Sequence, residues 1–293
     1  MRIRPSSVLA LLALALPLCA QEKFTLRYTL QPGPAAWYQQ DQDNKMAMKM
    51  GERTMNGLMA TSMWMECKVA AVKDGVATLE SKFARVKAKS DGMGGKTDYD
   101  SDVEGSRPGS FRGLAELVGQ TVKVSFDDTG KQTNVEVDDD VEAGLEKAGM
   151  SMKQTFAQAI LTWPKDPIAL GDTWTNEYGM PMGQMGKGKV VVTNKLVAVK
   201  DHVATVEQTS KIEVESKGLP PGMKLEVTKA SGSARIDLRV GMPLEMTTDV
   251  EMKIGGGGDT GAAMDMTMTM HSSIKQVPAP APKAAGKPED AKK

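Results

Sequence analysis

The residues of this sequence with the most distinctive chemistry are its methionines. The stretch AMDMTMTMH (263–271) places methionine at every second position and ends on His271. Thioether sulfur, alone or together with imidazole, is a soft ligand that favours copper(I). Methionine also fills apolar interiors, because its unbranched side chain adapts to irregular gaps. The two interpretations differ in whether the sulfurs and His271 can reach one point.

Strand geometry favours the apolar interpretation. In a β-strand, alternate residues share one face and lie about 6.6 Å apart. His271 then falls on the face opposite Met268 and Met270, the sulfurs nearest to it in the chain. We keep a metal site at Met268, Met270 and His271 only as an alternative, and we expect no cofactor.

The methionines are numerous and occur in clusters. The chain contains 22 of them, against 5 phenylalanines. Deformable methionine surfaces suit hydrophobic ligands of variable shape, so we predict a lining that binds a lipid or another hydrophobic small molecule. The alternative is a structural or interaction protein in which methionine fills a solid core. The predicted lining consists of Met46, Met48, Met50, Met63, Met65, Met246, Met252, Met264, Met266, Met268 and Met270.

The sequence predicts no catalytic residue and a protein that is not an enzyme. His202 falls in a predicted turn, and Cys67 falls on the apolar face of a predicted strand, where a small buried side chain is expected. No serine lies in a nucleophile-elbow motif, and the glycine run at 255–258 lacks the lysine that follows in a phosphate-binding loop.

An internal repeat organises the chain. VAAVKDGVATLE (69–80) matches LVAVKDHVATVE (196–207) at eight of twelve positions, with an offset of 127 residues. Repeats of this kind indicate duplication of one supersecondary unit. Asp74-Gly75 is a strong hairpin-turn signal, whereas Asp201-His202 is a poorer one and predicts a looser turn in the second copy.

The strand patterns predict an all-β fold. Met63, Met65, Cys67, Val69 and Ala71 alternate with polar residues, as expected of a half-buried antiparallel strand. We predict a mainly antiparallel sheet, either curved and barrel-like or folded as a sandwich, made of two repeated β units joined by a helix. A curved sheet closed over a helix is also the architecture of lipoprotein carriers, an analogy of fold alone.

Five segments follow from these patterns. The apolar spacing within 139–163 is helical and ends before Pro164, and a shorter helix is expected over 111–118. Acidic residues at 138–140 are expected to cap the longer helix. The segments are a signal peptide at 1–20, a first β repeat at 21–138, a connecting helix at 139–163, a second β repeat at 164–276 and a disordered tail of proline, alanine and lysine at 277–293.

The N-terminus and the charge balance predict an exported protein. Arg2 and Arg4 precede a short apolar run, and Ala20 is a plausible cleavage site for a secretory signal. Cys19 offers a lipid-anchored alternative, although Leu18 before it is larger than such sites prefer. We expect a periplasmic or extracellular protein. Lys+Arg and Asp+Glu both number 37, which argues against nucleic acid as a partner, and no later apolar run is long enough for an integral membrane protein.

Two motifs add a family resemblance. WPKDPIALGDTW (163–174), followed by VKDHVATVE, resembles the central part of an uncharacterised family of exported bacterial proteins, known as a domain of unknown function. LVGQTVKVSFDDTGK (117–131) is similar to an earlier strand-turn-strand of the same family. The resemblance covers about 24–277. It implies an exported β-rich envelope protein and assigns no activity.

Overall fold

The computed structural model describes residues 22–92, 95–147, 151–156, 160–181, 187–214, 224–239, 243–257 and 263–280. Its elements in chain order are β1 (Lys23–Phe24), β2 (Ala36–Met50), β3 (Arg53–Lys73), β4 (Val76–Asp91), β5 (Thr97–Asp100), the 3-10 helix η1 (Gly109–Phe111), α1 (Arg112–Ala115), β6 (Thr121–Asp127), β7 (Gln132–Glu136), α2 (Asp139–Lys147), α3 (Met152–Phe156), β8 (Ile168–Ala169), β9 (Thr173–Pro181), β10 (Lys187–Lys200), β11 (Val203–Val214), β12 (Lys224–Asp237), β13 (Pro243–Gly257) and β14 (Ala263–Val277).

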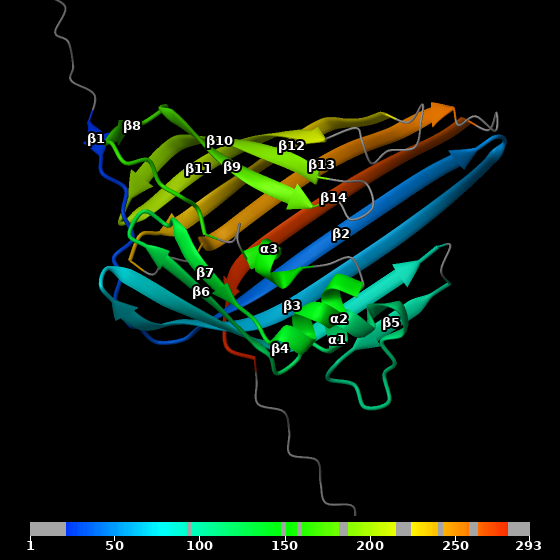
Figure 1. Ribbon diagram of the computed structural model, residues 1–293, viewed down its shortest axis with the longest axis horizontal. Helices are drawn as coiled ribbons and strands as arrows, with labels where there is room; N and C mark the ends of the chain where they lie inside the picture. Colours follow the sequence, from blue (N-terminus) through cyan, green and yellow to red (C-terminus); the bar gives the residue numbers. More distant parts are fainter. Residues whose placement is uncertain are drawn as a thin grey trace, which may run out of the picture.

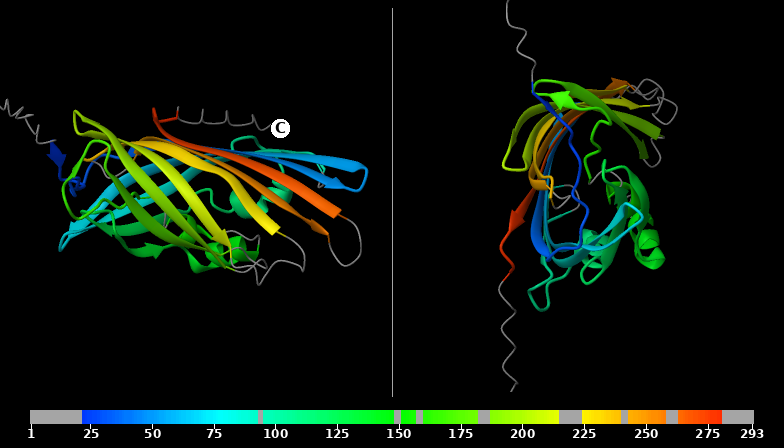
Figure 2. Two further views of the ribbon diagram at one scale, coloured as in Figure 1. Left: turned by 90° about the horizontal axis from the view of Figure 1, so that it is seen from above. Right: turned by 90° about the vertical axis from the view of Figure 1, so that its left-hand side faces the viewer.

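Twelve strands form one large sheet (Figure 1). Their order is β7-β6-β4-β3-β2-β14-β13-β12-β11-β10-β9, with β5 paired to β4, and all neighbours are antiparallel. The sheet curves around a space that contains the helices (Figure 2). In the described part of the chain β7 and β9 end this order, and β5, paired only with β4, is a further edge strand. The prediction of a mainly antiparallel curved sheet is therefore confirmed. The twelve strands form one sheet and not the two sheets of a sandwich, and β1 and β8 form a separate two-stranded antiparallel pair.

The two repeated hairpins have the same geometry. β3 pairs with β4 and β10 pairs with β11, and the ladder shifts by one residue between Val69 and Ala71 in the first and between Leu196 and Ala198 in the second. These bulges are 127 residues apart, the offset of the sequence repeat. Both turns have positive φ at both central residues, with φ 65° at His202. The expected loosening of the second turn is therefore wrong, because His202 adopts the left-handed conformation that a type I′ turn requires.

The bulge in β3 corrects one predicted face. Ala71 was expected to continue the apolar face of Cys67 and Val69, but it is exposed, and Val72 packs against the core instead. A bulge adds one residue to a strand, so every side chain beyond it moves to the other face.

The repeats follow each other along the sheet. The strands β2, β3, β4 and β6 hold the same relative places as β9, β10, β11 and β12. β14 pairs with β2 from Met264↔Met50 to Val277↔Trp37, and this ladder joins the two units. No strand edge is left uncovered at the junction, which removes a site for unwanted pairing with another chain.

Two short helices take the place of the single predicted helix at 139–163. Asp138 caps α2 by accepting hydrogen bonds from the backbone N–H groups of Asp140 (3.0 Å) and Val141 (3.3 Å), as the acidic run predicted. The buried Glu142 of α2 then accepts a hydrogen bond from the backbone N–H of Met152 (3.0 Å), at the start of α3. The Glu142 carboxylate therefore caps the start of α3, which explains why a second helix begins there. The spacing of apolar residues in the sequence does not show this.

The chain after α3 is extended because its backbone groups bond to other elements. The N–H of Trp163 donates to the carbonyl of Thr129 (2.7 Å), and the carbonyl of Leu161 accepts from the Tyr28 hydroxyl (2.9 Å). Trp163 also stacks between Tyr28 and Trp174, with ring centroids 5.7 and 5.8 Å away. This aromatic group anchors the segment 160–164 inside the curve of the sheet.

The N-terminal segment closes one end of the curved sheet, at the left of Figure 1. The N–H of Tyr28 donates to the carbonyl of Asp128 beside β6, and the N–H of Thr29 donates to the carbonyl of Leu238 beside β12. Leu26 and Tyr28 are buried in the core between these contacts. The segment therefore links the two repeats at the end opposite the tips of β2 and β13.

Some predictions fall outside the described residues. These are the signal peptide at 1–20 and the part of the tail from residue 281 onward. Within the described part of the chain, none of the helices has the length and apolar character needed to cross a membrane.

Replacement of Gly232 tests the packing of the sheet. A Cβ at Gly232 in β12 would clash with the carbonyl oxygen of Thr247 in β13. We expect Gly232→Ala to lower the free energy of unfolding by about 1–3 kcal/mol, because the neighbouring strand must shift. The measurement is chemical denaturation followed by circular dichroism.

Gly57→Ala in β3 is the matched control for this variant. A Cβ at Gly57 would meet only the side chain of Met46, at an ordinary 3.4 Å, so little change is expected. Equal midpoints for the two variants would contradict the close approach of β12 and β13.

Candidate functional site

The concave face of the sheet, which faces the helices, contains a partly open cavity of about 340 Å³. Phe156 of α3 and Leu161 border it on the side of the helices. Volumes of roughly 300–1,000 Å³ are usual for ligand pockets. The sheet supplies the other lining residues, which are Gln40, Met65, Cys67, Ser81, Tyr178, Val190, Val192, Gln208, Ser210, Ile212, Ser231, Gly232, Ala234, Pro243, Met246, Thr248, Val250, Met270, Ser272 and Ile274.

In the described part of the chain, none of the residues that line this cavity is charged. Charges of the same strands lie on the opposite, convex face, where cross-strand ion pairs connect neighbours, for example Lys189–Glu177 at 2.7 Å and Lys229–Asp249 at 3.7 Å. Burial raises the pKa of Tyr178, so its phenol is neutral at ordinary pH. The cavity is therefore an uncharged, mainly apolar environment.

The predicted methionine lining occupies one face, although only part of it borders the cavity. Met65, Met246 and Met270 line the cavity, and Met63 packs against the core next to it. Met46, Met48, Met252, Met266 and Met268 are half-buried further along the same face. Met50 and Met264 hold paired positions in β2 and β14, and their side chains lie outside the described part.

The half-buried methionines extend the apolar surface beyond the helices. β2, β13 and β14 reach past the helices to the upper right of Figure 1. There Met46, Met268 and Met252 stand in one row across β2, β14 and β13. We name Met46, Met48, Met252, Met266 and Met268 the methionine face.

The alternative metal site is not assembled by the fold. His271 lies on the convex face, with Nδ1 2.8 Å from Oδ1 of Asp249. Its cross-strand neighbours are Asp249 and Asp43, whereas Met268 and Met270 point to the concave face. The structure therefore separates the imidazole from the two sulfurs by the thickness of the sheet.

Cys67 and His202 have different surroundings, one buried in the sheet and the other exposed in a turn. Cys67 is buried, and its thiol donates a hydrogen bond to the Ser81 hydroxyl (3.3 Å). Burial raises the pKa of Cys67 to about 11, which opposes formation of a nucleophilic thiolate. His202 occupies the β10–β11 turn and is exposed.

Neither the polar nor the helical part of the lining was predicted from the sequence. Gln208, Thr248 and Ser272 occupy inward positions of strands whose other inward residues are mainly apolar, and this break in the alternation was a usable signal. Phe156 and Leu161 carried no such signal, because their place depends on how the helices pack inside the sheet.

A second hollow, of about 480 Å³, is shallower and lies mainly over the convex face near the β2–β3 hairpin. Lys45, Asp91 and Leu58 border it, and the Leu58 side chain is among the exposed large hydrophobic residues. Its charged and open surroundings make it less suited to an apolar ligand than the concave cavity.

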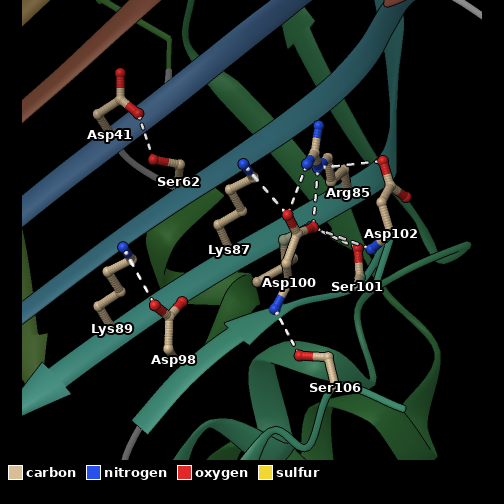
Figure 3. A network of polar contacts seen from close by, with 11 residues as sticks. Asp41, Ser62, Arg85, Lys87, Lys89, Asp98, Asp100, Ser101, Asp102 and Ser106 are labelled. Carbon is tan, nitrogen blue, oxygen red and sulfur yellow. Dashed lines mark hydrogen bonds and ion pairs between the residues drawn. The ribbon is translucent and has the colours of Figure 1, made fainter. Parts of the chain in front are cut away.

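A cluster of polar contacts joins β4 to β5 (Figure 3). The Arg85 guanidinium donates to both carboxylate oxygens of Asp100, at 3.1 and 2.7 Å, and lies 3.1 Å from Asp102. Lys87 is 3.2 Å from Asp100, and Arg85 also stands over the Trp64 ring at 5.1 Å. These contacts hold β5 and the following loop to the sheet, which is a structural role.

Residues 148–276 match a family of unknown function, DUF6263. The predicted resemblance to an uncharacterised family is therefore shown for this part of the chain. No curated protein matches the chain.

Distant likenesses are found among solved structures. A structure titled "Lipid-protein interactions in lipovitellin" has 12% identity and a TM-score of 0.46, over 87% of this chain and 26% of that chain. OccK5 (OpdH) of Pseudomonas aeruginosa has 6% identity and a TM-score of 0.25, over 83% of this chain and 98% of that chain. The chain thus spans about a quarter of the lipovitellin structure.

Asp100 is expected to make stability depend on pH. The hydrogen bonds from Arg85 hold the pKa of Asp100 below its ordinary value. A carboxyl with a lowered folded-state pKa stabilises the fold above its unfolded pKa of about 4, and this stabilisation is lost as the pH falls further. Asp100→Asn should lower the free energy of unfolding by about 1–3 kcal/mol at pH 7, and the difference from wild type should shrink below pH ~4.

Asp98→Asn on the same strand is the control for Asp100. Its ion pair with Lys89 is 3.3 Å long and exposed on both sides, so its loss should change stability by less than about 1 kcal/mol. Urea titrations at pH 7 and pH 3 give both comparisons. A difference between wild type and Asp100→Asn that stays constant with pH would contradict the role of the carboxylate.

Cys67 is expected to resist polar thiol reagents. With a pKa of about 11, its thiolate fraction at pH 8 is more than about 100-fold below that of a free cysteine. In a Cys19→Ser background, colour release from 5,5′-dithiobis(2-nitrobenzoate) should be slow in buffer and fast in urea. Fast reaction of the folded protein would contradict the burial of Cys67, and a Cys67→Ser variant supplies the blank.

Proposed function

We propose that this protein binds an elongated hydrophobic ligand, such as a lipid acyl chain, on the concave face of its sheet. The observation that carries the proposal is the uncharged cavity of about 340 Å³, bordered by Phe156 and Leu161 and continuous in the sheet with the methionine face. Transfer of an acyl chain from water to such a surface stabilises a complex by about 0.8 kcal/mol for each buried CH₂ group.

The methionine face supports an elongated ligand and not a compact one. Its side chains are half-buried and lie on strands that pass beyond the helices, so an apolar chain leaving the cavity would continue along them. Unbranched thioether side chains adapt to different chain shapes at small energetic cost. We further propose that the protein is exported and is not an enzyme, which the signal-like residues 1–20 and the separation of Cys67, His202 and His271 support.

A cavity-filling variant tests the proposal. Ser210 lines the cavity, and Ser210→Phe would occupy it, whereas the neighbouring Thr209 is exposed and points to the convex face. The probe is N-phenyl-1-naphthylamine, a neutral fluorophore whose emission rises in apolar sites. We expect Ser210→Phe to weaken probe binding at least about tenfold and Thr209→Phe to leave it unchanged, since only the first removes apolar volume.

Two results would contradict the proposal. One is a folded wild-type protein that does not bind the probe, and the other is equal binding by both phenylalanine variants. Circular dichroism and thermal melts establish that each variant is folded. Native mass spectrometry of the wild-type protein adds a separate readout, because bound copper without bound lipid would favour thioether coordination in the Met46–Met268–Met252 row instead.

A further inference from the structure

A row of uncharged residues, polar except for one glycine, crosses the concave face at right angles to the strands. Each member is the direct cross-strand partner of the next, over six neighbouring strands from β10 to β2, and the row ends on β3. We name it the polar row; it consists of Asn194, Gln208, Gly232, Thr248, Ser272, Gln42 and Thr61.

At one end of the polar row, the side-chain amides form hydrogen bonds with other amides of the protein. Asn194 is fully buried, and its amide donates to Oδ1 of Asn176 (2.8 Å). Gln208 Nε2 donates to Oδ1 of Asn194 (2.8 Å), and the Gln208 side-chain carbonyl oxygen is not used in this contact. This chain of amides fixes the Gln208 side chain where the row enters the cavity.

The middle of the polar row faces the cavity with unused hydrogen-bonding groups. Gln208, Gly232, Thr248 and Ser272 are consecutive in the row, and all four line the cavity. Among the contacts of the described residues, the Thr248 and Ser272 hydroxyls have no hydrogen-bond partner, and both residues are only half-buried. Two hydroxyl groups and one amide carbonyl can therefore bond to a ligand or to water in the cavity.

Apolar rows flank these polar groups on both sides. On one side Met246 is the cross-strand partner of both Ala234 and Ile274, and on the other side Val250 is the partner of Met270. A polar stripe between two apolar stripes matches a ligand that is itself amphipathic. A pure hydrocarbon would cover the Thr248 and Ser272 hydroxyls without bonding to them, and burial of an unbonded hydroxyl is unfavourable.

The charge of the ligand is restricted by the same lining. Among the residues that the structure describes, the cavity lining includes no lysine, arginine, aspartate, glutamate or histidine. An ionised carboxylate or phosphate would lose its hydration there without gaining an ion pair, and such transfer is strongly unfavourable.

We infer that the ligand is an uncharged amphiphile, an alkyl or acyl chain with an alcohol, ester or amide group that hydrogen-bonds to Gln208, Thr248 and Ser272. This inference rests on the proposed binding of a hydrophobic ligand and specifies its polar part. The polar group lies over the polar row, and the chain extends across Met270 toward the methionine face.

Three probes of equal chain length test the inference in the full-length protein. They are dodecan-1-ol, dodecanoate at pH 8.5 and dodecane, each measured by displacement of N-phenyl-1-naphthylamine. We expect dodecan-1-ol to displace the probe at concentrations at least about tenfold lower than dodecanoate, because only the carboxylate must be buried without a partner. Dodecanoate that competes as well as dodecan-1-ol would overturn the inference.

A double variant tests the hydroxyl groups directly. Thr248→Val with Ser272→Ala should weaken dodecan-1-ol about tenfold and should not weaken dodecane or the fluorophore, because the variant removes hydrogen-bonding groups and keeps the lining apolar. The matched control is Thr247→Val with Ser273→Ala, the neighbouring positions on the convex face. Equal dodecan-1-ol binding by the two double variants would also overturn the inference.

The outcomes separate this inference from the proposed function. Failure of the wild-type protein to bind the fluorophore removes both proposals. Fluorophore binding that is blocked by Ser210→Phe, together with no preference for dodecan-1-ol, removes only the uncharged-amphiphile inference. If the double variant does not fold, a pH series on wild type replaces it, because dodecanoate should bind more tightly as protonation removes its charge.

Discussion

β14 pairs with β2 along their whole length, and the remaining architecture depends on this ladder. It joins the last strand of the second repeat to the first strand of the first repeat, so that two units of local hairpins become one sheet. It also brings the methionines of 46–50 into register with those of 264–270, which are far apart in the chain. Neither cluster forms an extended apolar surface alone. The contact between the chain's two ends therefore creates both the concave face and its methionine surface.

A curved sheet with an apolar inner face is stabilised by elements that pack against that face, and the described helices pack against only part of it. α2, α3 and the segment 160–164 fill the curve over β4 and β6, where Phe156 packs edge-to-face on Phe83 with centroids 6.1 Å apart. Phe156 and Leu161 border the cavity, and the strands that carry the methionine face continue past the described helices (Figure 1). A surface of leucine or isoleucine there would require a closely shaped partner. A methionine surface can pack against partners of different shape, because the methionine side chain can change its conformation.

The sequence allowed prediction of features that depend on local periodicity. Alternation of apolar and polar residues identified the strands, placed His271 opposite Met268 and Met270, and gave the Asp74-Gly75 turn. The repeat also predicted that β10–β11 would copy β3–β4, which the equal offsets of their bulges show. The bulges themselves were not predicted, and for that reason Ala71 was placed on the wrong face. One extra residue leaves no trace in composition.

Features that depend on long-range packing could not be predicted in this way. The break between α2 and α3 follows from a buried carboxylate, Glu142, that caps the second helix, and its partners are known only once the helices are packed. The border of the cavity at Phe156 and Leu161 depends on the same packing. The methionines of the lining could be assigned to a face, but not divided into those that border the cavity and those beyond it.

The polar row shows why a site can be visible in a sequence without being recognised there. Gln208 follows the inward Val206, Thr248 stands between the inward Met246 and Val250, and Ser272 between Met270 and Ile274. Each residue alone is an ordinary polar interruption of an apolar face. Stability alone does not favour such interruptions, because a half-buried hydroxyl without a partner contributes less than a packed methyl group. Their alignment across successive strands, next to a cavity without charge, is the arrangement expected of a surface that recognises the polar group of a bound molecule.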